Sequence, residues 1–250
     1  MCHTKLTLRR RRVVIQTVTL NFFRFGPISQ RLWAFAQMGA ARFSMPKIPG
    51  IGFWKLCGSG TGEGFTPIPN TAVYAVLSTW DDMGSARAGQ TASVFQNYRK
   101  HADEAFTLYL SPTAARGSWS NQQPFRAIPA PDTSAGPIAA LTRATVKPSV
   151  ATRFWGRVPD ISTVIGSDPN VMFKIGIGEV PLLHQITFSI WPDTDAMANF
   201  ARRGGPHSEA IQAVRDEGWF SEELYARFHV LDAEGTWEGQ TPLPHFEDAA

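Results

Sequence analysis

Short runs of β-branched and aromatic residues alternate along the chain with longer stretches in which apolar residues recur at helical spacing. Val18 to Phe25 is typical of a strand. Ile28 to Arg42 is typical of a helix, because apolar residues recur through Leu32, Phe35 and Met38. The first half therefore predicts the order β-α-β-β-α-β, with strands at 18–25, near 53, near 73 and near 106, and helices over 28–42 and about 83–104.

Segments of the first half recur in the second half in the same order, which indicates an internal duplication. Phe53–Gly58 corresponds to Met172–Ile177, and Val73–Asp82 corresponds to His184–Asp193, in which each run of strand residues closes on a Trp. In this alignment Lys55 and Lys174 match. The second half predicts the same six elements, at 138–147, 152–165, near 171, near 184, 194–217 and near 224.

Two ferredoxin-like βαββαβ units in one chain predict an α+β fold. One unit leaves a face of its sheet uncovered, so we expect the two to pack as an intramolecular α+β barrel. Prolines punctuate residues 111–137, which indicates a linker. We expect a disordered basic tail (1–15), a first repeat (16–119), a linker (120–136), a second repeat (137–239) and a tail (240–250).

The composition is that of a folded protein, with 43% apolar and 18% charged residues. Its aromatic residues suit a pocket for a flat or greasy ligand, although a well-filled core explains them as well. The glycine-rich stretch from Gly58 to Pro67 predicts a mobile hairpin over a pocket. It does not predict a nucleotide site, because no Gly-Lys-Ser/Thr ending follows.

The formal net charge of +3 owes much to the run Arg9 to Arg12, which either attracts anionic lipid or is a solvated tail. Nucleic acid is not an expected partner, because no aromatic residues interleave with this run. Polar residues interrupt Val13–Phe25, so it cannot span a membrane. We expect a cytoplasmic location, and peripheral contact with the inner membrane is a second possibility that the basic run leaves open.

Candidate chemistry is limited to a few residue types. Only two cysteines, Cys2 and Cys57, are present, so a metal would need His or carboxylate ligands or would arrive inside a cofactor. Hydrolase chemistry is excluded because neither a Ser-His-Asp spacing nor a Gly-x-Ser-x-Gly elbow occurs. The remaining candidates are histidines and cations within predicted strands and helices.

His207 follows Gly204-Gly205-Pro206 and begins a predicted helix over 208–219. It shares the apolar stripe of that helix with Ala210 and Ile211, so its ring is expected to point inward. A helix N-terminus keeps the imidazole neutral and able to bind iron. The alternative is a capping or core histidine. His184, on one face of a strand with Ile186, is the second candidate and could equally be a core residue.

Three cations lie in predicted strands, and an inward cation costs free energy unless it is paired. Arg143 stands among Ala, Leu and Thr, and Lys55 and Lys174 stand among apolar residues. They are candidates to meet cofactor propionates or bound oxygen, or are rim residues. Arg143 and Lys174 are the catalytic candidates. Lys55, and Trp191 at the end of its strand, are cofactor-binding candidates beside the two histidines.

Several segments resemble the spheroidene monooxygenase family of carotenoid-making phototrophic bacteria, over about residues 16–239. They are Gln16–Leu20, Arg31–Trp33, Phe53–Lys55 with Gly58–Gly62, Pro137–Lys147, Phe173–Gly176, and Glu223–Phe228 with Glu234–Gly239.

The resemblance implies a haem-dependent oxygenase that uses O2 and a ferredoxin-type electron donor to introduce a keto group at C2 of spheroidene-type acyclic carotenoids. Related haem-binding α+β barrels place the axial histidine on a helix of the C-terminal copy, a position that His207 fits. Three other functions stay open: a cofactor-free monooxygenase of the antibiotic-biosynthesis type, a haem enzyme similar to aldoxime dehydratase, and a haem or carotenoid carrier without catalysis.

Overall fold

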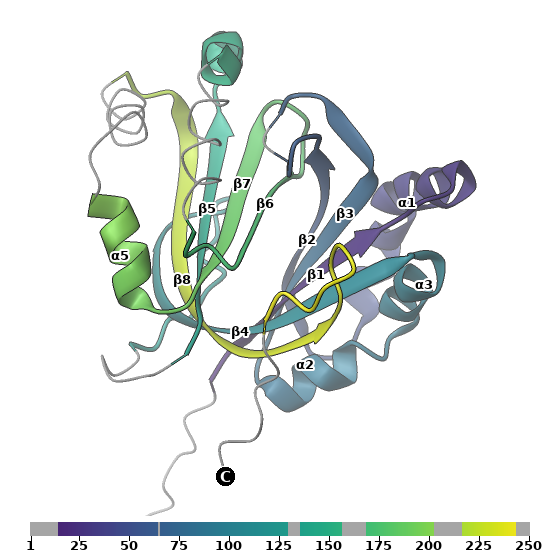
Figure 1. Cartoon of the computed structure of the whole chain (residues 1–250). Helices are drawn as coiled ribbons and strands as arrows, with labels where there is room; N and C mark the ends of the chain where they lie inside the picture. The colour runs from purple at the N-terminus through teal and green to yellow at the C-terminus, as the bar shows by residue number, and fades with distance from the viewer. Residues whose placement is uncertain (1–14, 65, 130–135, 157–168, 203–216, 244–250) are drawn as a thin grey trace, which may run out of the picture.

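The computed structural model describes residues 15–64, 66–129, 136–156, 169–202 and 217–243 (Figure 1). Within these residues eight strands form one closed barrel, in the order β1-β3-β2-β6-β7-β5-β8-β4. All neighbouring strands are antiparallel. The strands are β1 (Thr17–Arg24), β2 (Ile51–Gly60), β3 (Pro69–Trp80), β4 (Glu104–Gly117), β5 (Ile138–Val146), β6 (Phe173–Gly178), β7 (His184–Trp191) and β8 (Phe220–Gly235).

The barrel consists of two sheets of the same topology. The first half has the order β4-β1-β3-β2 and the second half has β8-β5-β7-β6, which is the ferredoxin-like order twice. Even the turns after β4 and β8 agree, since Trp119 pairs with Gln122 and Trp237 pairs with Gln240. The predicted α+β fold, with a duplicated unit and a barrel within one chain, is confirmed.

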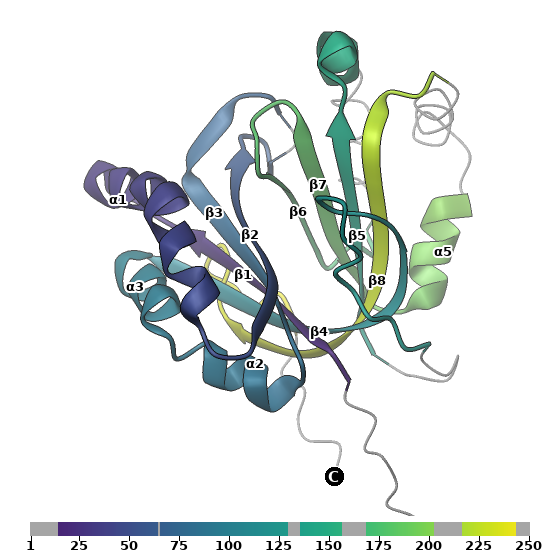
Figure 2. The same cartoon turned by 180° about the vertical axis from the view of Figure 1, so that it is seen from behind.

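Two seams of unequal length join the halves (Figures 1 and 2). Between β4 and β8 the pairing runs from Phe106 opposite Gly235 to Gly117 opposite Leu224. Between β2 and β6 only two residue pairs form, Gly58 with Gly178 and Ser59 with Ile177. The second seam is therefore the weaker junction of the barrel.

The helices lie outside the barrel. They are α1 (Ile28–Ala40), α2 (Met83–Gly89), α3 (Ser93–His101) and α5 (Thr194–Arg202), with 3-10 turns at Ala41–Phe43, Met45–Lys47 and Pro148–Val150. The single helix predicted over 83–104 is wrong, because a turn at residues 90–92 separates α2 from α3 and β4 already begins at Glu104. Gly89 packs so closely on Trp80 that a Cβ there would lie 2.1 Å from the indole ring. The helices predicted over 152–165 and 194–217 are described as helical for residues 151–156 and 194–202. The helix predicted over 208–219 is wrong at its end, because residues 217 and 218 form a turn in which Gly218 has φ +58°.

Residues 120–126 and 240–243, which the sequence placed in a linker and a tail, pack against the barrel. Phe125 is buried, and the side chain of Gln16 bonds to the backbone of Pro124 and Arg126. Leu243 is also buried in the core inside the barrel. The strand β4 continues through Pro112, which is tolerated because the register shifts there and a bulge needs no ladder N–H.

Alternation along each strand divides the side chains between two sides of the wall. The side that faces the barrel interior carries a large aromatic cluster, in which the ring centroids of Phe22 and Phe173 lie 5.3 Å apart. The side that faces the helices forms a second core in the first unit, around Phe23, Tyr74 and Tyr98. These two layers position the features described next.

Candidate functional site

On the inner side of the barrel wall, side chains from both units form a partly buried group that we call the ion cluster: Lys55, Arg143, Glu179, Glu222 and His184. The Nζ atom of Lys55 lies 2.7 Å from Oε1 of Glu179. The guanidinium of Arg143, which is 1% exposed, lies 2.5 Å from Oε2 of Glu222 and 3.7 Å from Oε2 of Glu179. The positive charges of Lys55 and Arg143 therefore balance the negative charges of Glu179 and Glu222.

Trp119 lies above this cluster and helps to hold it. Its Nε1 donates to Oε2 of Glu179 at 2.7 Å, and the guanidinium of Arg143 lies 5.7 Å from the ring centroid. Lys55 lies 5.9 Å from the same ring and donates to the Ser120 hydroxyl. The turn after β4 thus brings an aromatic face against two cations, an arrangement that stabilises them away from water.

Glu222 fastens the same turn to β8. It accepts from the backbone N–H groups of Ser120 and Asn121 at 3.0 and 2.7 Å, and from the Ser118 hydroxyl at 3.0 Å. Burial would raise the pKa of Glu222, but these hydrogen bonds, together with Arg143, outweigh it and lower the pKa to about 2. Glu222 is therefore ionised over the whole physiological pH range.

We predict that Glu222→Gln lowers stability at neutral pH and that this loss shrinks as the solution becomes acidic. The ionised carboxylate is favoured in the folded state, so its contribution is complete above the ordinary value of 4.5 and is lost as the pH falls towards about 2. Urea unfolding of both proteins at a series of pH values measures the difference.

The control for this measurement is Asp81→Asn, which removes the exposed carboxylate that pairs with Arg126 at 2.8 Å. Exposed ion pairs contribute little, so its stability should follow that of the wild type at every pH. A Glu222→Gln deficit that stays constant down to pH 2 would contradict the role given to the carboxylate charge.

His184 lies at the start of β7 on the inner side, as the alternation with Ile186 predicts. Its Nδ1 is 3.6 Å from Oε2 of Glu179, too far for a good hydrogen bond. Burial is the largest influence on its pKa and lowers it, with Arg143 and Lys55 acting in the same direction and Glu179 against them. The ring is therefore held neutral, next to cations rather than among metal ligands.

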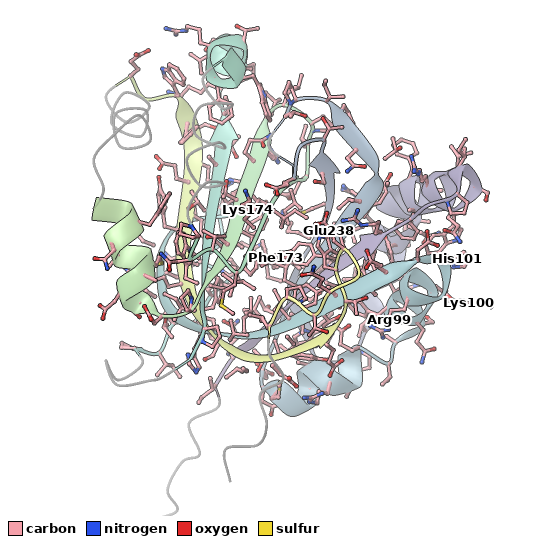
Figure 3. The ribbon with its side chains drawn as sticks, in the orientation of Figure 1. Arg99, Lys100, His101, Phe173, Lys174 and Glu238 are labelled. Atoms are coloured by element: carbon pink, nitrogen blue, oxygen red, sulfur yellow. The ribbon has the colours of Figure 1, made fainter. Side chains whose placement is uncertain are left out.

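The other predicted residues lie elsewhere. Lys174 pairs with Glu63 at 2.8 Å, close to Phe173 and Glu238 (Figure 3). Trp191 is buried on the helix side of β7, where its Nε1 donates to the Ser189 hydroxyl at 3.0 Å. His207, the predicted iron ligand, lies outside the described residues. The structure thus brings together Lys55, Arg143 and His184, and leaves Lys174 and Trp191 apart.

The alignment that matched Lys55 with Lys174 is wrong by one residue. In the structure Trp80 and Trp191 are equivalent, because they pair with Thr17 and Ile138 at the start of equivalent strands. In that frame Lys55 lies opposite Leu77, on the inner side, whereas Lys174 lies opposite Ser189, on the helix side. A bulge in β2 between Ile51 and Trp54 accompanies this difference.

A cavity of about 330 Å³, which we call the apolar groove, lies over the short seam between β2 and β6. Phe35 and Met38 of α1 line one side, and Trp155 lines another. Its remaining walls come from the glycine-rich hairpin and the turn between β6 and β7, including Gly60, Gly64, Thr66, Pro67, Pro69, Gly178, Val180 and Leu182. His184 and Glu179 also line it, so the ion cluster borders the groove.

The hairpin predicted over a pocket does line this groove, because glycine lets it lie directly on β6. Gly64 has φ +91°, and a Cβ there would lie 1.8 Å from the carbonyl oxygen of Gly176. The backbone N–H of Gly176 donates to the carbonyl of Glu63 at 2.7 Å. A larger residue at position 64 would lift the hairpin and open the wall of the groove.

The helix side of the second sheet differs from that of the first. With Trp80 and Trp191 equivalent, bulky residues of the first unit correspond to small or polar residues of the second: Phe23 to Ala144, Leu56 to Gly176, Tyr74 to Gln185 and Val76 to Thr187. We call this area the small-residue face: Ala140, Thr142, Ala144, Gly176, Thr187 and Ser189. Thr142 is exposed and Thr187 is half-buried, so the strand residues that the structure describes on this face supply little side-chain bulk. Gln185, which pairs with Ala144 next to this face, also lines the apolar groove.

Sequence reasoning missed Glu179, Glu222 and Trp119. The sequence suggested cofactor propionates or bound oxygen as partners of Lys55 and Arg143, whereas the structure pairs them with Glu179 and Glu222. Among the described residues no group of three His, Cys, Asp or Glu side chains could hold a metal ion. None of the helices described there is long and apolar enough to cross a bilayer.

Comparison with known proteins adds relatives to this geometry. No family model matches the chain. Spheroidene monooxygenase from Cereibacter sphaeroides is 52% identical over 231 residues, which cover 92% of this chain and 71% of the relative. The Rhodobacter capsulatus protein of the same name is 51% identical, covering 90% and 94%. That of Rubrivivax gelatinosus is 37% identical, covering 84% and 80%.

Among solved structures, two aldoxime dehydratases share the fold, with TM-scores of 0.58 and 0.59 at 11% identity. They cover 87% and 89% of this chain, and the matches span 82% and 83% of theirs. At that identity they show the duplicated barrel and nothing about chemistry. The three sequence relatives agree over most of this chain, including both halves of the barrel. The chain therefore belongs to the spheroidene monooxygenase family.

Proposed function

We propose that this protein is a haem-dependent monooxygenase that introduces a keto group at C2 of spheroidene-type acyclic carotenoids. Its substrates would be the carotenoid and O2, with electrons from a ferredoxin-type donor. The names of the relatives support the substrate class. The observation that carries the cofactor assignment is the small-residue face, where the second unit lacks the bulk that the first unit has.

The residues present fit a flat macrocycle on that face. Small side chains leave a surface on which a planar group can lie, and cations stand on the strands at its two edges. Lys174 is on β6, and Arg227 is on β8 opposite Ala140. Both are suited to carboxylate groups such as haem propionates. Lys174 would have to exchange its partner Glu63, whose side chain is 55% exposed, for a propionate. Lys55 and Arg143 share the carboxylates of the ion cluster on the other side of the wall.

Bound haem would supply the activation of O2 that no side chain can provide. The chain would hold the substrate and exclude water. The apolar groove suits the end of a hydrocarbon chain, because its lining is mostly apolar and it shares Gln185 with the region of the small-residue face. Each hydroxylation consumes O2, two electrons and two protons and releases water. A second hydroxylation at the same carbon gives a geminal diol, which loses water to form the ketone.

We predict that His207→Ala abolishes haem retention while the protein stays folded. The neutral imidazole of His207, expected from the sequence, would hold the haem iron. Wild type and variant are reconstituted with haemin, and the Soret band after desalting is compared. Circular dichroism checks the fold.

The matched control is His184→Ala, which removes a histidine that contacts the ion cluster and should leave the Soret band unchanged. Loss of the band in His184→Ala instead would make our ligand assignment wrong. No Soret band in the wild type would remove the haem itself. Reduced wild-type protein with spheroidene and oxygen should then yield the 2-keto product, and failure to do so would overturn the proposed activity.

A further inference from the structure

Large apolar side chains surround the mouth of the apolar groove and stay in contact with water. Phe35 of α1 is 68% exposed, and Ile68 at the tip of the glycine-rich hairpin is 63% exposed. The stripe continues along α1 through Leu32 and Ile28, which precede Phe35 at helical spacing and are 64% and 75% exposed. Val180 and Leu182, in the turn between β6 and β7, complete what we call the apolar rim.

This exposure is unusual for an amphipathic helix. A surface helix normally turns its apolar stripe to the core, but α1 buries only Ala34 fully and presents Ile28, Leu32 and Phe35 outward. Exposed apolar patches of this kind mark contact with a membrane or another protein. The charges around the rim distinguish between these two.

The part of the chain that carries α1 is strongly basic. From Ile28 to Lys47 the chain contains Arg31, Arg42 and Lys47 and no Asp or Glu. Arg42 lines the groove next to the rim, and Lys47 follows it on the surface. A rim of apolar side chains flanked by cations is complementary to a bilayer with anionic headgroups.

A second basic group lies beside α1 at the end of α3. Arg99, Lys100 and His101 form its last turn (Figure 3). Lys100 is exposed, whereas Arg99 is half-buried and donates to Gln90. The ring of His101 stacks on Trp33 of α1, with the ring centroids 4.0 Å apart, so this group is fixed to the same helix as the rim. Asp103 follows along the chain, and Glu104 is paired with Arg24. Cations therefore dominate this end of α3.

We propose that the apolar rim docks on an anionic lipid surface, so that the groove opens directly into the bilayer. Docking depends only on the rim and its cations. The added role, entry of the substrate from the lipid into the groove, rests on the proposed function. An apolar carotenoid partitions into membranes, so a mouth within the lipid spares it a passage through water.

The test is flotation of the full-length protein with vesicles of phosphatidylcholine alone and with phosphatidylglycerol added. The wild type should bind the anionic vesicles. Phe35→Glu and Leu32→Glu should each weaken binding about tenfold or more, because each replaces an apolar side chain that would enter the bilayer by a charge. Ile128→Glu is the matched control, since Ile128 is an exposed apolar residue outside the rim. It should bind like the wild type.

Lys100→Glu should weaken binding to anionic vesicles and leave binding to neutral ones unchanged. Equal binding of the wild type and Phe35→Glu would overturn the proposal, as would failure of the wild type to prefer anionic lipid. A wild-type dimer that Phe35→Glu converts to a monomer would also overturn it, because the rim would then be an interface between copies. None of these measurements requires activity, so an inactive protein that still docks would sink the proposed function and leave the docking intact.

Discussion

Replacing Arg143 by Ala is expected to lower the free energy of unfolding by about 3–5 kcal/mol, because it leaves the mostly buried carboxylate of Glu222 without its cation. Arg143 itself is 1% exposed, whereas Glu179 keeps Lys55 as its partner. Urea unfolding followed by circular dichroism measures the loss. The change should appear in the midpoint, with the slope of the transition unchanged.

The control removes a cation of the same type from an exposed pair. Arg126 lies 2.8 Å from Asp81, with both side chains mostly exposed, so Arg126→Ala should cost less than about 1 kcal/mol. The double variant Arg143→Met/Glu222→Gln should recover part of the loss, because it removes the carboxylate of Glu222 together with its cation and so leaves no unpaired charge at this position. Equal destabilisation by Arg143→Ala and Arg126→Ala would mean that the ion cluster is more hydrated than its burial indicates.

The second large effect is expected at the small-residue face, where Thr142→Phe should prevent haem uptake. Thr142 is exposed on β5 opposite Thr187 and Tyr225, so a larger side chain fits the folded protein but occupies the surface on which a planar group would lie. Haemin titration followed at the Soret band should show at least a roughly tenfold weaker affinity.

Two controls separate blocking from damage. Thr142→Val removes the hydroxyl but keeps the size of the side chain, so it should bind haemin like the wild type. Thr236→Phe places the same ring at an exposed threonine beyond the end of β8 and should also bind normally. Normal binding by Thr142→Phe, with its fold intact, would place the cofactor somewhere other than the small-residue face.

The sequence predicted the order of strands and the duplication, because both depend on local alternation and on repeated segments. It did not predict the break between α2 and α3, which depends on the close contact of Gly89 with Trp80, a residue of the preceding strand. It also misaligned Lys55 with Lys174, because a β-bulge changes which side a residue faces without leaving a mark in the composition.

The candidate site was predictable only in part. Alternation in its strand placed His184 on one face together with Ile186, whereas for Arg143 an inward and a rim position both stayed open. Their partners did not follow from the sequence, because Glu179 lies in a turn and Glu222 at the start of β8, and only closure of the barrel brings them together. The small-residue face required the register of both sheets, so that equivalent positions of the two units could be compared. His207 stays a prediction.

The short junction between β2 and β6 also bears on how a long, rigid polyene could be admitted. Two strand residue pairs hold it, together with the contacts of Glu63 with Gly176 and Lys174, whereas β4 and β8 pair along eleven positions. We therefore expect local opening of the wall to begin at this junction, which lies beneath the apolar groove. The gap between β2 and β6 could thus widen with the loss of a few hydrogen bonds. Both sheets would stay folded, and the longer seam between β4 and β8 would act as the hinge.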